Sequence, residues 1–115
     1  MEIQETEAFR RSVDKVLKKY PRAAKDIEDG INSVASNPDQ GMSYPGIEPV
    51  VKKTRLGMPS YKQGKRGGMR LIYIAKTMLT PIFLYVKGQF SSEGEIKEAT
   101  KKQAKEVIEE LSAKR

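Results

Sequence analysis

The stretch that decides the fold runs from Lys62 to Gln89, where a basic loop is followed by two apolar segments. Residues 62–76 read KQGKRGGMRLIYIAK, and residues 81–89 read PIFLYVKGQ. The first segment is rich in β-branched and aromatic residues, and residues 82–86 are continuously apolar, as expected for a central strand buried on both faces. The two segments therefore predict neighbouring strands. Residues 77–80 predict the turn between them, and Pro81 predicts the start of the second strand.

Residues 50–56 predict a third strand, which the loop 57–68 joins to the strand beginning at Met69. Because the three strands follow one another along the chain, an antiparallel meander is the simplest sheet. Residues 2–5 could add one short strand. Residues 38–49 hold three Pro and two Gly without periodicity, and they predict a loop.

Two amphipathic helices precede the strands, and a third helix follows them. Thr6 is a suitable N-cap for the first helix, and Tyr20 with Pro21 ends it. The second helix ends at Asn37, so the pair predicts a helical hairpin. Ser92 begins the last helix, where Ser92 and Glu95 fit a capping box. We therefore predict one α+β domain over residues 1–115. It has two layers, a mostly antiparallel sheet of three to four strands, an N-terminal helical hairpin and a C-terminal helix.

The composition excludes several classes of function. The 115-residue chain contains no Cys and no His, so it lacks thiolate metal ligands and the side chain that most often serves as a general base. No apolar run approaches the roughly 18 residues that a membrane span needs. The N-terminus is acidic and polar, unlike a signal peptide. We expect a cytoplasmic protein with no cofactor, no metal ion and no membrane association.

Positive charge is concentrated in one part of the chain. The net charge is +7, and the window from Pro49 to Ser92 holds none of the 15 acidic residues. Such asymmetry favours a polyanionic partner, most simply nucleic acid, over a basic surface kept for solubility. The basic residues of this window are Lys52, Lys53, Arg55, Lys62, Lys65, Arg66, Arg70, Lys76 and Lys87.

Alternation places Arg70, Ile72, Ile74 and Lys76 on one face of their strand. A guanidinium at the head of an apolar row can hold a phosphate through two hydrogen bonds. It can equally reach solvent at the sheet edge or pair with a carboxylate. On the preceding strand, Lys52 and Thr54 alternate with Lys53 and Arg55, so only one of these sets can share the face of Arg70.

Two other features accompany the cations. Gly67 and Gly68 permit a tight turn or the close approach of another backbone, but they lack the spacing of a phosphate-binding loop. Aromatic side chains near cations suit base stacking. They are Tyr61, Tyr73, Tyr85 and Phe90, of which Tyr73 and Tyr85 are mid-strand positions more typical of core.

The block GKRGGMRLIY at residues 64–73, followed by LYVK at residues 84–87, resembles the RelE/HigB group of the RelE/ParE toxin superfamily. Members show a Gly-Lys-x-Gly-Gly-x-Arg-φ-φ-Tyr block and then an apolar strand that ends in lysine or arginine. The predicted order of elements is also similar to the β-α-α-β-β-β-α order of that superfamily. These are toxins of bacterial type II toxin–antitoxin systems.

The resemblance implies a ribosome-dependent mRNA endoribonuclease (an mRNA interferase) that inhibits translation by cutting mRNA in the 30S A site. It also implies a cognate antitoxin and binding of the toxin–antitoxin complex to its operator DNA. By position, Arg70 matches the strand arginine that contacts the scissile region, and Lys87 matches the basic residue ending the last strand. Lys53 and Arg55 fall on the strand where relatives place lysines. A C-terminal tyrosine used by some members has no counterpart here.

We therefore predict a metal-independent reaction in which the 2′-hydroxyl of RNA attacks the adjacent phosphate. Clustered cations would stabilise the developing charge and lower the pKa of a neighbouring lysine, which could then act as the base. A ParE-like toxin acting on DNA gyrase and a non-catalytic nucleic-acid-binding relative are the alternatives. The predicted catalytic residues are Arg70, Lys87, Lys53 and Arg55, and the predicted RNA contacts are Lys52, Lys62, Lys65, Arg66, Lys76 and Phe90.

Overall fold

The centre of the fold is a five-stranded sheet with the strand order β1-β5-β4-β3-β2. The structure is a computed structural model that describes residues 1–113. Strands β3, β4 and β5 form the predicted antiparallel meander, and β1 pairs in parallel with β5. The α+β class is confirmed, and the sheet is wider than the three to four strands predicted. The strands are β1 (Glu2–Ile3), β2 (Met42–Tyr44), β3 (Val51–Leu56), β4 (Met69–Ala75) and β5 (Met78–Val86).

Strand β5 is buried on both faces, as its apolar sequence predicts. Every residue from Leu79 to Val86 is buried. The strand begins at Met78, so the prediction that Pro81 starts it is wrong. Pro81 lies opposite Tyr73, beside a shift of register that makes Ile82 an extra residue in the ladder. A proline without an N–H is tolerated at such an irregularity, because the regular hydrogen bond is already interrupted there.

The prediction that residues 38–49 form only a loop is also wrong. Met42–Tyr44 forms strand β2, which pairs antiparallel with β3 at the edge of the sheet. A three-residue strand is too short to show alternation in the sequence. Its conformation comes from pairing with β3, which is a tertiary contact.

The helices begin and end close to the predicted residues. Thr6 caps α1 (Glu7–Lys19), where its Oγ1 accepts a hydrogen bond of 3.0 Å from the N–H of Phe9. A 3₁₀ turn over Pro21–Ala23 leads into α2 (Ala24–Ser36), which ends before Pro38. Ser92 precedes α3 (Glu93–Ala113), and its Oγ accepts from the N–H of Glu95 at 3.2 Å. None of the helices over residues 1–113 is both long and apolar enough to cross a membrane.

Helices α1 and α2 cover one face of the sheet with the larger apolar cluster. Phe9, Val13 and Val16 of α1 pack there with Leu71 and Leu84 of the sheet. The close approach of α2 depends on its glycine. A Cβ at Gly30 would lie 2.8 Å from Cδ1 of Leu56, so the residue that weakens the helix makes room for a strand side chain.

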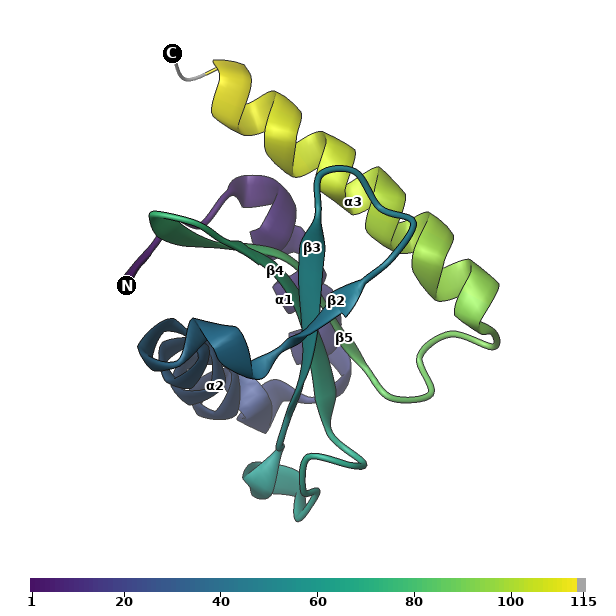
Figure 1. Cartoon of the computed structure of the whole chain (residues 1–115). Helices are drawn as coiled ribbons and strands as arrows, with labels where there is room; N and C mark the ends of the chain where they lie inside the picture. Colours follow the sequence, from purple (N-terminus) through teal and green to yellow (C-terminus); the bar gives the residue numbers. More distant parts are fainter. Residues whose placement is uncertain (114–115) are drawn as a thin grey trace.

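Helix α3 packs across part of the opposite face, so Figure 1 shows α2 and α3 on different sides of the sheet. Ala104 and Val107 are buried against Ile72 and Phe83. The end of α3 also reaches the start of α1, where the Glu110 carboxylate accepts from the N–H groups of residues 7 and 8 at 2.7 and 3.0 Å. The helix adds partial cover beyond the two predicted layers. At the end of this face where β4 begins, Arg55 is exposed and Arg70 is half-buried.

Candidate functional site

Two arginines lie directly opposite each other at the start of β4. Arg55 of β3 is the cross-strand partner of Arg70, and Tyr85 of β5 is the partner of Arg70 on its other side. Partners in an antiparallel ladder project from the same face, with Cβ atoms about 5 Å apart. Like charges at such positions destabilise a sheet. We call this surface, defined by Lys53, Arg55, Arg70 and Tyr85, the cationic face.

Backbone carbonyl groups of the glycine-rich loop hold the guanidinium of Arg70. Its Nη1 donates to the carbonyl oxygens of Lys65 and Met69 at 3.1 and 3.2 Å, and its Nη2 donates to that of Arg66 at 2.9 Å. A guanidinium has five N–H donors, so donors remain for a ligand. Burial lowers the pKa of Arg70, and the charge of Arg55 lowers it further. The side chain is thus positioned by neutral oxygens that leave its charge uncompensated.

Lys53 lies on the same face, between two aromatic rings and one carboxylate. Its Nζ is 4.7 Å from the ring centre of Tyr44, 5.4 Å from that of Tyr85 and 3.7 Å from Oε1 of Glu93. Burial lowers the pKa of Lys53, Glu93 opposes this shift, and Arg70 and Arg55 add to it. Burial and the two arginines thus shift the pKa of Lys53 in the direction that favours a proton acceptor.

Tyr85 lies beneath Lys53 with its hydroxyl group buried. The ring is 2% exposed and contacts Phe83 and Phe90, with ring centres 5.3 and 5.7 Å away. Within residues 1–113 its hydroxyl has no hydrogen-bond partner. Burial raises the pKa of Tyr85, so the phenol stays protonated and can donate but cannot act as a base at neutral pH.

Several predicted residues lie elsewhere. Lys52 is on the opposite face of β3, with its Nζ 3.6 Å from Oδ1 of Asp39. Lys76 lies beyond the end of β4, about 20 Å along the strand from Arg70. Alternation placed Lys76 on the same face of the strand as Arg70, but the structure does not bring the two side chains together, and an RNA contact at Lys76 stays a prediction. The exposed Lys62, Lys65 and Arg66 belong to the loop whose backbone surrounds the Arg70 guanidinium.

Lys87 is exposed and lies one residue beyond the last pair of the β4–β5 ladder. It lines a pocket of about 450 Å³ between α1 and the turn that follows β5. We call this the basic pocket. Its lining residues are Lys15, Val16, Lys19, Tyr20, Val86, Lys87, Gly88, Gln89 and Phe90.

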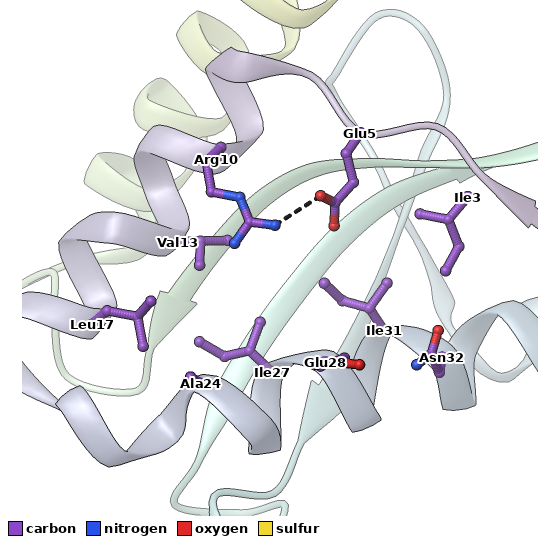
Figure 2. A pocket seen from close by; sticks show the side chains of 10 residues that line it. All are labelled: Ile3, Glu5, Arg10, Val13, Leu17, Ala24, Ile27, Glu28, Ile31 and Asn32. Atoms are coloured by element: carbon purple, nitrogen blue, oxygen red, sulfur yellow. Dashed lines mark hydrogen bonds and ion pairs between the residues drawn. The ribbon is translucent and has the colours of Figure 1, made fainter.

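A second pocket, of about 280 Å³, lies between α1 and α2 (Figure 2). Its walls are mainly aliphatic, from residues such as Leu17, Ile27 and Ile31. At its rim, Nη2 of Arg10 lies 2.8 Å from Oε2 of Glu5. It is on the helical side of the sheet, away from the cationic face. It has no part in the site described here.

Three residues beside the cationic face were not predicted from the sequence. Tyr44 and Glu93 contact Lys53 and each other, with the hydroxyl of Tyr44 donating to Oε1 of Glu93 at 3.4 Å. Nζ of Lys97 lies 5.7 Å from the Tyr44 ring centre. They come from β2 and the first turn of α3. Neither element adjoins the motif in sequence, so no local signal could have identified them. Tyr85 was visible in the motif, but its mid-strand position indicated core.

Comparison with protein-family models and with curated proteins finds no match. Over residues 1–113, no cluster of three or more acidic, Cys or His side chains has the arrangement of a metal site. The site is therefore interpreted from its own chemistry, which is three cations on one sheet face, an exposed carboxylate beside one of them, and aromatic rings in tilted and edge-to-face contact.

Proposed function

We propose that this chain is the toxin of a type II toxin–antitoxin system, a metal-independent endoribonuclease that cuts mRNA on the ribosome and inhibits translation. One observation carries the proposal. Lys53, Arg55 and Arg70 share one sheet face, with two of the three directly opposite each other. A polyanion that binds at this face would reduce the repulsion between the cations.

The chemistry follows from the groups on this face. The 2′-oxygen of the substrate attacks the adjacent phosphorus, and the bond from phosphorus to the 5′-oxygen breaks. The products are a 2′,3′-cyclic phosphate and, once the 5′-oxygen takes a proton from water, a 5′-hydroxyl. The guanidinium groups of Arg55 and Arg70 stabilise the charge that develops on the phosphate oxygens. A cation cluster repels a divalent metal ion. The side chains on this face therefore supply the charge stabilisation that such an ion provides in metal-dependent nucleases.

Two groups on this face can accept the proton of the 2′-hydroxyl. Lys53 can do so in its neutral form, which its lowered pKa favours. The carboxylate of Glu93, 3.7 Å from Lys53, is the other. Replacing each distinguishes them. If Lys53 is the acceptor, K53M abolishes cleavage and E93Q does not, whereas the opposite pattern assigns the role to Glu93.

The proposal includes a cognate antitoxin that covers the cationic face. Strand β2 is an edge of the sheet, and Tyr44 on it contacts Lys53. An acidic antitoxin segment could add a strand at this edge or lay a helix over the face. In the proposed system the toxin acts in the cytoplasm, and the toxin–antitoxin complex binds its operator DNA.

Inducing the chain in a bacterial host and mapping mRNA 5′ ends, with and without translation, tests the proposal. We expect translation-dependent cuts within codons. R70A should reduce cleavage about 10²- to 10³-fold, as for the loss of one transition-state donor. R70K keeps the charge and tests the geometry of the guanidinium. R11A is the matched control, because Arg11 is an exposed helix residue whose Nη2 lies 3.7 Å from Glu106.

The other outcomes separate the competing functions. Undiminished growth arrest by a folded R70A protein would remove Arg70 from the site. Defects in supercoiling without RNA cuts would identify gyrase as the target. Growth without arrest, together with intact RNA, would indicate a non-catalytic binding module. Circular dichroism spectra of each variant show whether the fold is kept.

A further inference from the structure

The basic pocket between α1 and the turn after β5 has the chemistry of a second anion site. Its lining contains three lysines, Lys15, Lys19 and Lys87, and no acidic residue. Its volume of about 450 Å³ lies in the range of small-ligand sites, roughly 300–1,000 Å³. The pocket was not predicted from the sequence, where Lys15 and Lys19 form part of the polar face of an amphipathic helix.

The three ammonium groups come from two elements of defined shape. Lys15 and Lys19 are one helical turn apart, so they project from the same side of α1. The turn that carries Lys87 is closed by hydrogen bonds between Val86 and Gln89, at 2.9 and 3.0 Å, and by Gly88 at a φ of +86°. A glycine is suited to that φ, so the turn keeps Lys87 beside the helix.

Some lysines of this protein have a carboxylate partner, and among the residues that the structure describes the three that line the pocket do not. Lys25 pairs with Asp29, and Lys101 pairs with Glu98. Across the described chain, residues 1–113, no ion pair joins Lys15, Lys19 or Lys87 to a carboxylate. Cations near the end of a helix complement its dipole, which accounts for Lys19 but not for the more central Lys15 or for Lys87. Their combined charge favours an anion.

Phe90 connects this pocket to the cationic face. It lines the pocket, and its ring centre is 5.7 Å from that of Tyr85, above which Lys53 lies. Both sites are at the same end of the sheet, because the start of β4 pairs with the end of β5. Because α1 packs on the other face of the sheet, a strand bound at Arg70 has to turn around the end of β5 to reach the lysines, and Phe90 lies at that end. An aromatic ring along such a path suits base stacking.

We propose that the basic pocket binds the phosphate backbone of the same single-stranded RNA, beyond the bond held at the cationic face. This inference rests on the proposed function. Lys15 and Lys19 contact phosphate oxygens, and Phe90 supports a base between the two sites. They position the substrate and take no part in the bond-breaking step.

Binding of a fluorescent 2′-O-methyl oligoribonucleotide, which cannot be cleaved, is measured by anisotropy over a range of salt concentrations. On a single strand, each neutralised phosphate contributes about 0.7 to the slope of log K against log salt. We expect the double variant K15Q/K19Q to lower that slope by about 1.4 and to weaken binding about tenfold at low salt. The control K101Q/K105Q removes the same charge at the same helical spacing on α3. It should leave the slope almost unchanged.

Equal losses in the two double variants would show a diffuse charge effect and would overturn the proposal. A slope that K15Q/K19Q leaves unchanged would also overturn it, as would a loss confined to duplex DNA. Cleavage by the unmodified chain is assayed separately. If K15Q/K19Q lowers the slope but no RNA is cut, the nuclease proposal fails and the pocket stands. If RNA is cut and the slope is unchanged, the pocket proposal fails alone.

Discussion

Replacing Tyr85 with phenylalanine should make the protein more stable. The hydroxyl of Tyr85 is buried, and among residues 1–113 it has no hydrogen-bond partner. A buried hydroxyl without a partner costs about 1–3 kcal/mol relative to its hydrated state. Phenylalanine keeps the ring contacts with Phe83 and Phe90 and removes that cost. We expect Y85F to raise the free energy of unfolding by about 1 kcal/mol, which for a domain of this size raises the Tm by about 4 °C.

The same substitution at Tyr73 provides a control of opposite sign. Its hydroxyl donates to the carbonyl of Pro38 at 2.7 Å and accepts from the N–H of Gly41 at 3.1 Å. Y73F therefore loses two hydrogen bonds and should be destabilised by about 1–2 kcal/mol. Urea unfolding followed by far-UV circular dichroism measures both. A loss of stability in Y85F as large as that in Y73F would refute the reasoning, because it would mean that the Tyr85 hydroxyl is well hydrogen-bonded.

Three further predictions concern stability. G68A should lower the free energy of unfolding by about 2 kcal/mol or more, because a Cβ at Gly68 would overlap a backbone carbonyl of β3. The control is G64A, where a Cβ meets nothing within 4 Å, and it should change the free energy of unfolding in urea by less than about 0.5 kcal/mol. D26A should lower the free energy of unfolding by about 2 kcal/mol, because the buried Asp26 carboxylate accepts two hydrogen bonds of 3.1 Å from Ser60. Asp29 is exposed, so D29A should lower it by only about 0.3 kcal/mol in the same assay. Because the folded state lowers the pKa of Lys53, the unfolded chain binds more protons between that pKa and about 10.4, so stability should rise with pH there. Unfolding curves from pH 8 to 10 should show the native chain gaining stability relative to K53M, and parallel curves would contradict the shift.

Elements with a strong local sequence signal could be predicted from the sequence. The N-cap at Thr6, the breaks at Pro21 and Pro38, and the long apolar run of β5 each act over a few residues. Their effect therefore does not depend on the rest of the chain. Elements without a local sequence signal were not predicted. Strand β2 has three residues, and its conformation depends on pairing with β3.

The candidate site was predicted in part. The motif identified Arg70, and alternation on β3 left two sets of side chains as candidates for the same face. The observed register selects Lys53 and Arg55 and places Lys52 beside Asp39. Lys76 lies far from Arg70 along the strand, because alternation specifies the face of a strand and not the position along it.

The sequence by itself determined the class of fold, the acid-free segment and the arginine at its centre, because composition and periodicity are properties of neighbouring residues. Only the tertiary structure brought Glu93 and Tyr44 to Lys53, left the Tyr85 hydroxyl without a partner and placed Lys15 and Lys19 beside Lys87. Those contacts join residues far apart in the chain. Burial and charge then act through space, and they lower the pKa of Lys53 in a way that no stretch of sequence could have specified.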